Sequence, residues 1–145
     1  MKNNDNLFYV CSLIEYIARK TTNRRCDVVK QMDGELQRIY DYADVFHCEP
    51  IEKVADDFIR KDHIVNGDYD NLSDCRYLVP DYWDIGEVFA RLIEDCYKDV
   101  NVINGMKEVY GSWLADKILN FNSDLYYQSR DYIAACYKEG KMLLA

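Results

Sequence analysis

The side chains of this sequence that could perform acid–base or metal chemistry are two histidines and a cluster of aspartates. His47 and His63 belong to no H-E-x-x-H or C-x-x-C-H pattern, which are common spacings for zinc and haem sites. No G-x-S-x-G, G-x-x-x-x-G-K-[ST] or G-x-G-x-x-G motif occurs, so an elbow nucleophile, a P-loop and a dinucleotide site lack their usual signal. We therefore expect that the protein is not an enzyme.

The closely spaced Asp68, Asp70 and Asp74 suggest a calcium loop, since hard cations require several oxygen ligands. An EF-hand loop needs Gly at its sixth position and Glu at its twelfth. Counting from Asp68, these positions hold Ser73 and Val79. We therefore expect no metal site and no cofactor.

The charge of the chain is acidic and unevenly distributed. Its 18 Lys and Arg against 26 Asp and Glu give a formal charge of −8 over 145 residues. Residues 64–100 carry nine acidic and three basic side chains, whereas residues 101–145 carry five of each. Because phosphate contacts require Lys and Arg, this balance argues against direct nucleic-acid binding. No stretch approaches the roughly 18 uncharged apolar residues that a membrane span needs, so we expect no membrane insertion.

The cysteines and the first twenty residues bear on the cellular compartment. The six cysteines lack C-x-x-C spacing, and several fall on apolar helical positions, which is typical of reduced structural thiols. Asp5 precedes the first apolar stretch and Glu15 interrupts it, unlike a signal peptide. We therefore expect a cytoplasmic protein.

The spacing of apolar residues predicts helices along most of the chain, and the low Gly and Pro content disfavours a turn-rich β architecture. We predict an all-α fold, a compact bundle of about seven helices in a single domain spanning residues 1–145. Two helical halves, 1–63 and 84–145, would be joined by a long ordered loop at 64–83. The predicted helices cover about 5–21, 26–32, 36–46, 50–61, 85–96, 101–121 and 129–139.

The predicted loop interleaves aspartates with aromatic side chains. Tyr and Trp are favoured at protein interfaces, and carboxylates attract a basic partner. One interpretation is therefore a partner-binding surface, and the alternative is that the aromatic rings fold back as a lid on the core. Tyr126 and Tyr127, beside a predicted break at 122–124, are also not easily explained as core. The predicted partner-binding residues are Asp68, Tyr69, Asp70, Asp74, Tyr77, Asp81, Tyr82 and Trp83.

Residues 8–29 (FYVCSLIEYIARKTTNRRCDVV) and 39–61 (IYDYADVFHCEPIEKVADDFIRK) resemble a small all-helical bacterial family of unknown function. Its members carry Tyr, an aliphatic residue and His, here Tyr42, Val45 and His47, before an aliphatic-Asp-Asp-aliphatic helix. The second half of the chain is similar to a companion protein from such loci. The genes of that family often lie beside a gene for an ADP-ribosyltransferase-like protein, as in toxin–antitoxin pairs. The resemblance implies no catalytic or binding residue.

Together, the acidic, aromatic loop, the lack of catalytic motifs and the resemblance predict a non-enzymatic protein-binding factor. The resemblance points to an antitoxin or immunity-like protein that neutralises an ADP-ribosyltransferase-like toxin, and the acidic loop predicts a partner with a basic surface. A second hypothesis is an acidic mimic of nucleic acid that inhibits a DNA- or RNA-binding protein. A third is an unrecognised enzyme, for which His47, Tyr42 and Asp44 are the best candidates. The sequence is compatible with both a monomer and a homo-oligomer.

Overall fold

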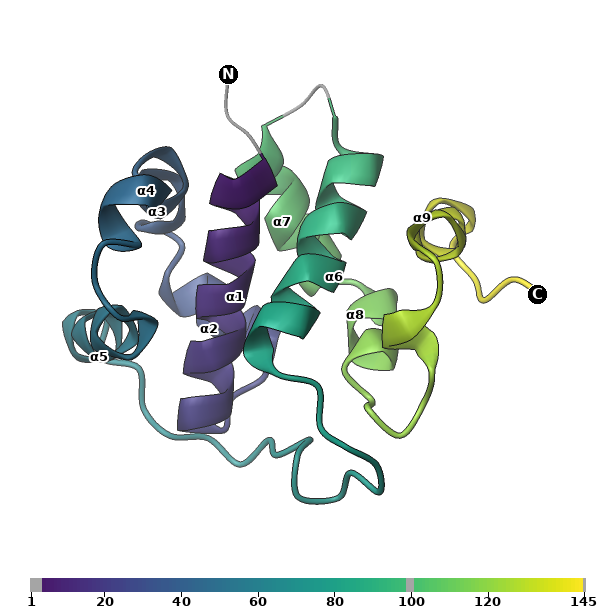
Figure 1. Ribbon diagram of the computed structural model, residues 1–145, viewed down its shortest axis with the longest axis horizontal. Coiled ribbons are helices and arrows are strands. Elements are labelled where there is room, and N and C mark those ends of the chain that lie inside the picture. The colour runs from purple at the N-terminus through teal and green to yellow at the C-terminus, as the bar shows by residue number, and fades with distance from the viewer. Residues whose placement is uncertain (1–3, 99–100, 145) are drawn as a thin grey trace.

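The computed structural model describes residues 4–98 and 101–144, and all regular elements in these ranges are helical (Figure 1). The all-α prediction is confirmed, with nine α-helices in the described ranges in place of about seven. The elements are α1 (Asn4–Thr21), α2 (Arg25–Gln31), α3 (Leu36–Asp41), α4 (Ala43–Phe46), α5 (Ile51–Lys61), α6 (Tyr82–Cys96), α7 (Val102–Tyr110), α8 (Trp113–Ile118), the 3₁₀ turn η1 (Leu125–Tyr127) and α9 (Arg130–Glu139).

The pair formed by α1 and α6 is the centre of the fold, and these two helices share the most extensive contact in the molecule. Most of α1 is buried, including Leu13 and Ile17, which are fully inaccessible to solvent. Gly86 lets α6 approach closely, because a Cβ atom there would lie 2.2 Å from Oγ of Ser12. Both halves of the chain therefore contribute to one hydrophobic core.

The remaining helices lie on either side of this pair. α3, α4 and α5 pack beside α1, whereas α9 lies at the opposite edge of the molecule and contacts α6 (Figure 1). α2 and α7 contact each other as well as the central pair. Among the helices of the described ranges, none has the length and apolar character that a membrane span requires.

Two predicted helices are each divided in the structure. The helix predicted over 36–46 breaks at Tyr42, whose backbone leaves the helical region (φ −118°, ψ 31°). The helix predicted over 101–121 breaks at Gly111 and Ser112 and ends by Leu119. Ser112 is extended (ψ 162°), and its hydroxyl donates to the carbonyl of Val109, a local bond that competes with helix continuation.

The connection between α5 and α6 spans residues 62–81 and crosses beneath the end of α1 (Figure 1). Its first part is fixed to the turn after α1, since the amides of Gly67 and Tyr69 donate to the carbonyls of Thr21 and Thr22, each at 2.8 Å. Its end differs from the prediction, because α6 begins at Tyr82 and includes two residues that were expected in the loop.

Candidate functional site

Tyr69, one of the predicted partner-binding residues, packs against the protein itself. The guanidinium groups of Arg24 and Arg25 lie 5.4 and 5.8 Å from the centre of its ring. Burial raises the pKa of its hydroxyl, and Arg25 opposes this effect. For this residue the structure therefore shows the lid arrangement, with the ring over the end of α1 and the start of α2.

Tyr82 and Trp83 also face inward, from the first turn of α6. Tyr82 makes an edge-to-face contact with Tyr16 at 5.0 Å between ring centres, and Trp83 lies 5.4 Å from Phe8. These contacts join α6 to α1, so both aromatic side chains belong to the packing between the two helices. Both side chains are half-buried, and they lie on α6 and not in the exposed part of the loop.

The four predicted aspartates have different surroundings. Asp70 accepts hydrogen bonds from the hydroxyl of Ser73 and from the amides of Ser73 and Leu72, and these bonds hold its pKa below the ordinary value. Asp81 is the N-cap of α6 and accepts from the amide of Asp84 at 2.7 Å. Both therefore support the local backbone. All four aspartates, including Asp68 and Asp74, are exposed.

Tyr77, the last of the predicted residues, remains 63% exposed and lies at a hollow of about 500 Å³. Tyr127, which is 68% exposed, also lines this hollow. The ring of Tyr126 is nearly perpendicular to those of Tyr127 and Phe121, at centre distances of 4.9 and 5.8 Å. We call this hollow the tyrosine groove. Its lining consists of Tyr77, Phe121, Asn122, Ser123, Asp124, Tyr126 and Tyr127.

Hydrogen bonds from Asn122 fix the two walls of the groove to each other. Its side chain accepts from the amide of Arg76 at 2.8 Å and donates to the carbonyl of Asp74 at 3.1 Å. Earlier in the loop, the side chain of Asn71 donates to the carbonyl of Leu119 at 2.8 Å. The groove is therefore held in shape by the fold.

The electrostatics around the groove are strongly one-sided. Tyr77 has one basic neighbour, Arg76, whose guanidinium lies 5.9 Å from the centre of its ring. Arg76 is also the one arginine of the described chain without a carboxylate partner. Six carboxylates of the loop, the start of α6 and the groove lining form no ion pair within the described residues, and one of them, Asp124, lines the groove. They are Asp68, Asp70, Asp74, Asp81, Asp84 and Asp124.

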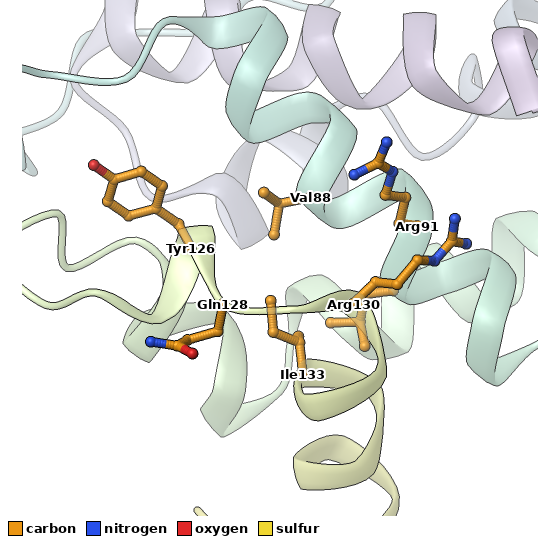
Figure 2. Close-up of a pocket in the computed structure, with 7 residues that line it drawn as sticks. Val88, Arg91, Tyr126, Gln128, Arg130 and Ile133 are labelled. Carbon is orange, nitrogen blue, oxygen red and sulfur yellow. The ribbon is translucent and has the colours of Figure 1, made fainter. Parts of the chain in front are cut away.

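A much smaller hollow, of about 40 Å³, lies on the other side of Tyr126. Figure 2 shows that the ring of Tyr126 points away from the two arginines at its rim, Arg91 and Arg130. Both arginines are already paired, with Glu87 and Asp95 respectively, each at 2.8 Å. This hollow holds little more than water and carries no unpaired charge, so the tyrosine groove is the stronger candidate site.

The residues proposed for an enzyme have mostly structural contacts. The ring of His47 packs at a tilt against Tyr9 and Trp83, at 5.1 and 5.9 Å between ring centres. Tyr42, at the break between α3 and α4, and Asp44, on α4, are exposed. Within residues 4–98 and 101–144, no group of three or more His, Cys, Asp or Glu side chains is arranged to hold a metal ion.

Sequence reasoning missed one wall of the groove, formed by Asn122, Asp124 and Tyr127. The signal available was the pair of tyrosines beside a helix break, which had no obvious place in a core.

Comparison of the chain with protein-family models, with curated proteins and with solved structures finds no match in any of the three. An assignment of function therefore depends on the geometry and charge of the tyrosine groove.

Proposed function

We propose that the protein is a non-catalytic binding factor that holds a basic protein partner on the tyrosine groove. The observation that carries this proposal is the pair of exposed rings, Tyr77 and Tyr127, which line one groove together with Asp124, a carboxylate that forms no ion pair within the described residues. Tyrosine is enriched among the residues that dominate binding energy at protein interfaces. An exposed aromatic pair held in place by side-chain hydrogen bonds is well suited to that role.

Charge and rigidity would contribute in different ways. The unpaired carboxylates accelerate encounter with a basic surface, an effect that salt screens. The contacts of Arg76 with Tyr77 illustrate how a guanidinium group is attracted to these rings. Because Asn122 already fixes the loop, binding would not have to order this segment, which lowers the entropic cost of association.

The partner class implied by the resemblance is an ADP-ribosyltransferase-like toxin, and an antitoxin or immunity-like role remains part of this proposal. In that role the groove would cover a basic substrate cleft. A cytoplasmic location is also proposed, since all six cysteines are free thiols, as in a reducing compartment. The alternative function, a mimic of nucleic acid, would require rows of acidic groups on one face. In this loop tyrosines stand between the carboxylates, which favours a protein-binding surface over a nucleic-acid mimic.

Binding measurements on groove variants test the proposal. The titrated partner is an ADP-ribosyltransferase-like protein, the partner class that the resemblance implies. Tyr77→Ala and Tyr127→Ala should each weaken the Kd about 30-fold, the effect of losing a hot spot worth about 2 kcal/mol. Tyr42→Ala is the matched control, because this tyrosine is 58% exposed outside the groove, and it should leave the Kd unchanged.

The salt dependence of association gives a second, independent measurement. Asp74→Asn combined with Asp124→Asn should slow association at low salt, and the difference from the wild type should shrink at high salt. Equal effects of the groove and control tyrosines, or no binding by the wild type, would refute the proposed function. A purified partner that also binds double-stranded DNA and is displaced by it would favour the mimic.

A further inference from the structure

A second large hollow lies between α2 and α7, away from the residues that form the tyrosine groove. Its volume is about 390 Å³, which lies within the range of small-molecule sites, roughly 300–1,000 Å³. Its lining combines apolar or weakly polar groups with charged ones, and nothing in the proposed protein-binding function uses it. The residues considered below are Cys26, Val29, Lys30, Asp33, Lys107 and Tyr110.

The charges at this hollow leave one positive group uncompensated. Lys107 forms an ion pair with Asp33, so those two charges cancel. Lys30 forms no ion pair with any residue in the described part of the chain. A bound monoanion would neutralise this ammonium group.

The remaining walls suit an apolar ligand body. Val29 and Tyr110 are core residues, 4% and 3% exposed, that reach this hollow from the two helices. Cys26 is half-buried at its edge and is a free thiol. Ligand sites typically consist of such apolar walls with a few placed polar groups that fix the ligand's orientation.

We propose that this hollow binds a small amphiphilic monocarboxylate. The carboxylate lies between the ammonium groups of Lys30 and Lys107, and the hydrocarbon part packs on Val29 and Tyr110. A phosphate dianion fits less well, because it would exceed the single uncompensated positive charge. This site is independent of the tyrosine groove, so partner binding and ligand binding fail or succeed separately.

The thiol of Cys26 provides a direct readout of occupancy. Alkylation of the full-length protein by iodoacetamide is followed by peptide mass spectrometry, with sodium octanoate as the probe. At about ten times its Kd, octanoate should slow alkylation of Cys26 about tenfold, because the bound state protects the thiol. Octanamide, which has the same chain without the charge, should protect far less. Cys48, which is exposed, serves as the internal control and should react at an unchanged rate.

A lysine variant tests whether Lys30 binds the carboxylate of octanoate. Lys30→Met should reduce protection by octanoate to the level seen with octanamide. Lys117→Met, at another exposed lysine that forms no ion pair with a described residue, should leave protection intact. Chemical-shift changes at the Val29 methyl groups report the same binding without any alkylation. The proposal is wrong if octanoate protects Cys26 no better than octanamide, if Cys48 is protected equally, or if Lys30→Met has no effect.

Discussion

Arg25 holds the carboxylate of Glu15 in a two-pronged ion pair inside the fold. Its Nε and Nη2 donate to the two carboxylate oxygens at 2.8 and 2.6 Å, and each side chain is only 1% exposed. Nε of Arg19 donates to the same carboxylate at 2.8 Å. The ring of Tyr69 covers Arg25 from the loop. This network therefore connects α1, α2 and the long loop.

Removing one member of this ion pair should be far more costly than removing both. Glu15→Leu leaves the buried guanidinium of Arg25 without its main partner, and the expected loss in the free energy of unfolding is about 3–5 kcal/mol. The double variant Glu15→Leu/Arg25→Met removes both charges and should recover most of that loss. Urea unfolding followed by circular dichroism measures both values. A double variant as unstable as the single one would contradict this account.

The same ion pair should make stability depend on pH in the acid range. Burial raises the pKa of Glu15, but the charges and hydrogen bonds of Arg25 and Arg19 outweigh burial and hold it below 4.5. The folded state thus binds this proton less readily than the unfolded state does. The resulting stabilisation is complete above the unfolded pKa and is lost as the pH falls through the folded one.

Urea unfolding across pH values from about 3 to 6 tests this expectation. The free energy of unfolding of the wild type should fall as the pH drops below about 4.5, and that of Glu15→Gln should fall less steeply. The comparison is needed because Asp70 and Glu35 also have lowered pKa values and remain in both proteins. Parallel curves would show that folding leaves the pKa of Glu15 unchanged, which would contradict this account.

Local sequence signals predicted several helix ends correctly. Ser129 caps α9 by accepting from the amide of Tyr132 at 3.2 Å, and Gly140 ends that helix with φ at 74°. Asn101 likewise caps α7. These motifs involve residues at most three positions from the helix end. The buried role of Glu15 was not predictable in this way, because its main partner lies ten residues later on another helix.

The candidate site was only partly predictable for a related reason. The composition of the loop indicated exposed aromatic residues, but periodicity does not say which rings of an irregular segment face the core. Tyr77 is exposed, whereas the ring of Tyr69 packs against the guanidinium groups of Arg24 and Arg25. The opposite wall, which includes Tyr127, comes from a segment about fifty residues later in the chain. Tertiary hydrogen bonds, made by Asn71 and Asn122 among others, bring the two walls together.

Gly86 should tolerate no side chain, because α1 and α6 are in direct backbone contact there. A Cβ atom would lie 2.8 Å from both N and Cα of Ser12, atoms that cannot rotate away. Gly86→Ala should therefore destabilise the protein by about 3 kcal/mol through overpacking, although alanine favours helix by about 1 kcal/mol. The melting temperature from circular dichroism should fall by roughly 6–12 °C.

Gly34→Ala is the matched control for this substitution. A Cβ atom at Gly34 has no heavy atom within 4 Å, and its backbone needs no left-handed conformation. Its melting temperature should therefore equal or slightly exceed that of the wild type. If the two variants melted together, the close approach of α1 and α6 at Gly86 would not be a determinant of stability.

Asn122 should control the rigidity of the tyrosine groove without controlling the fold. Asn122→Ala removes two hydrogen bonds to the loop, worth about 1 kcal/mol each, so the loop should open roughly 30-fold more often. Limited trypsin digestion measures this directly, because Arg76 lies within the loop, and cleavage after it should accelerate by a similar factor. Asn104→Ala, at an exposed position on α7, should leave the rate unchanged. Unchanged cleavage in Asn122→Ala would mean that packing, and not these two bonds, fixes the groove.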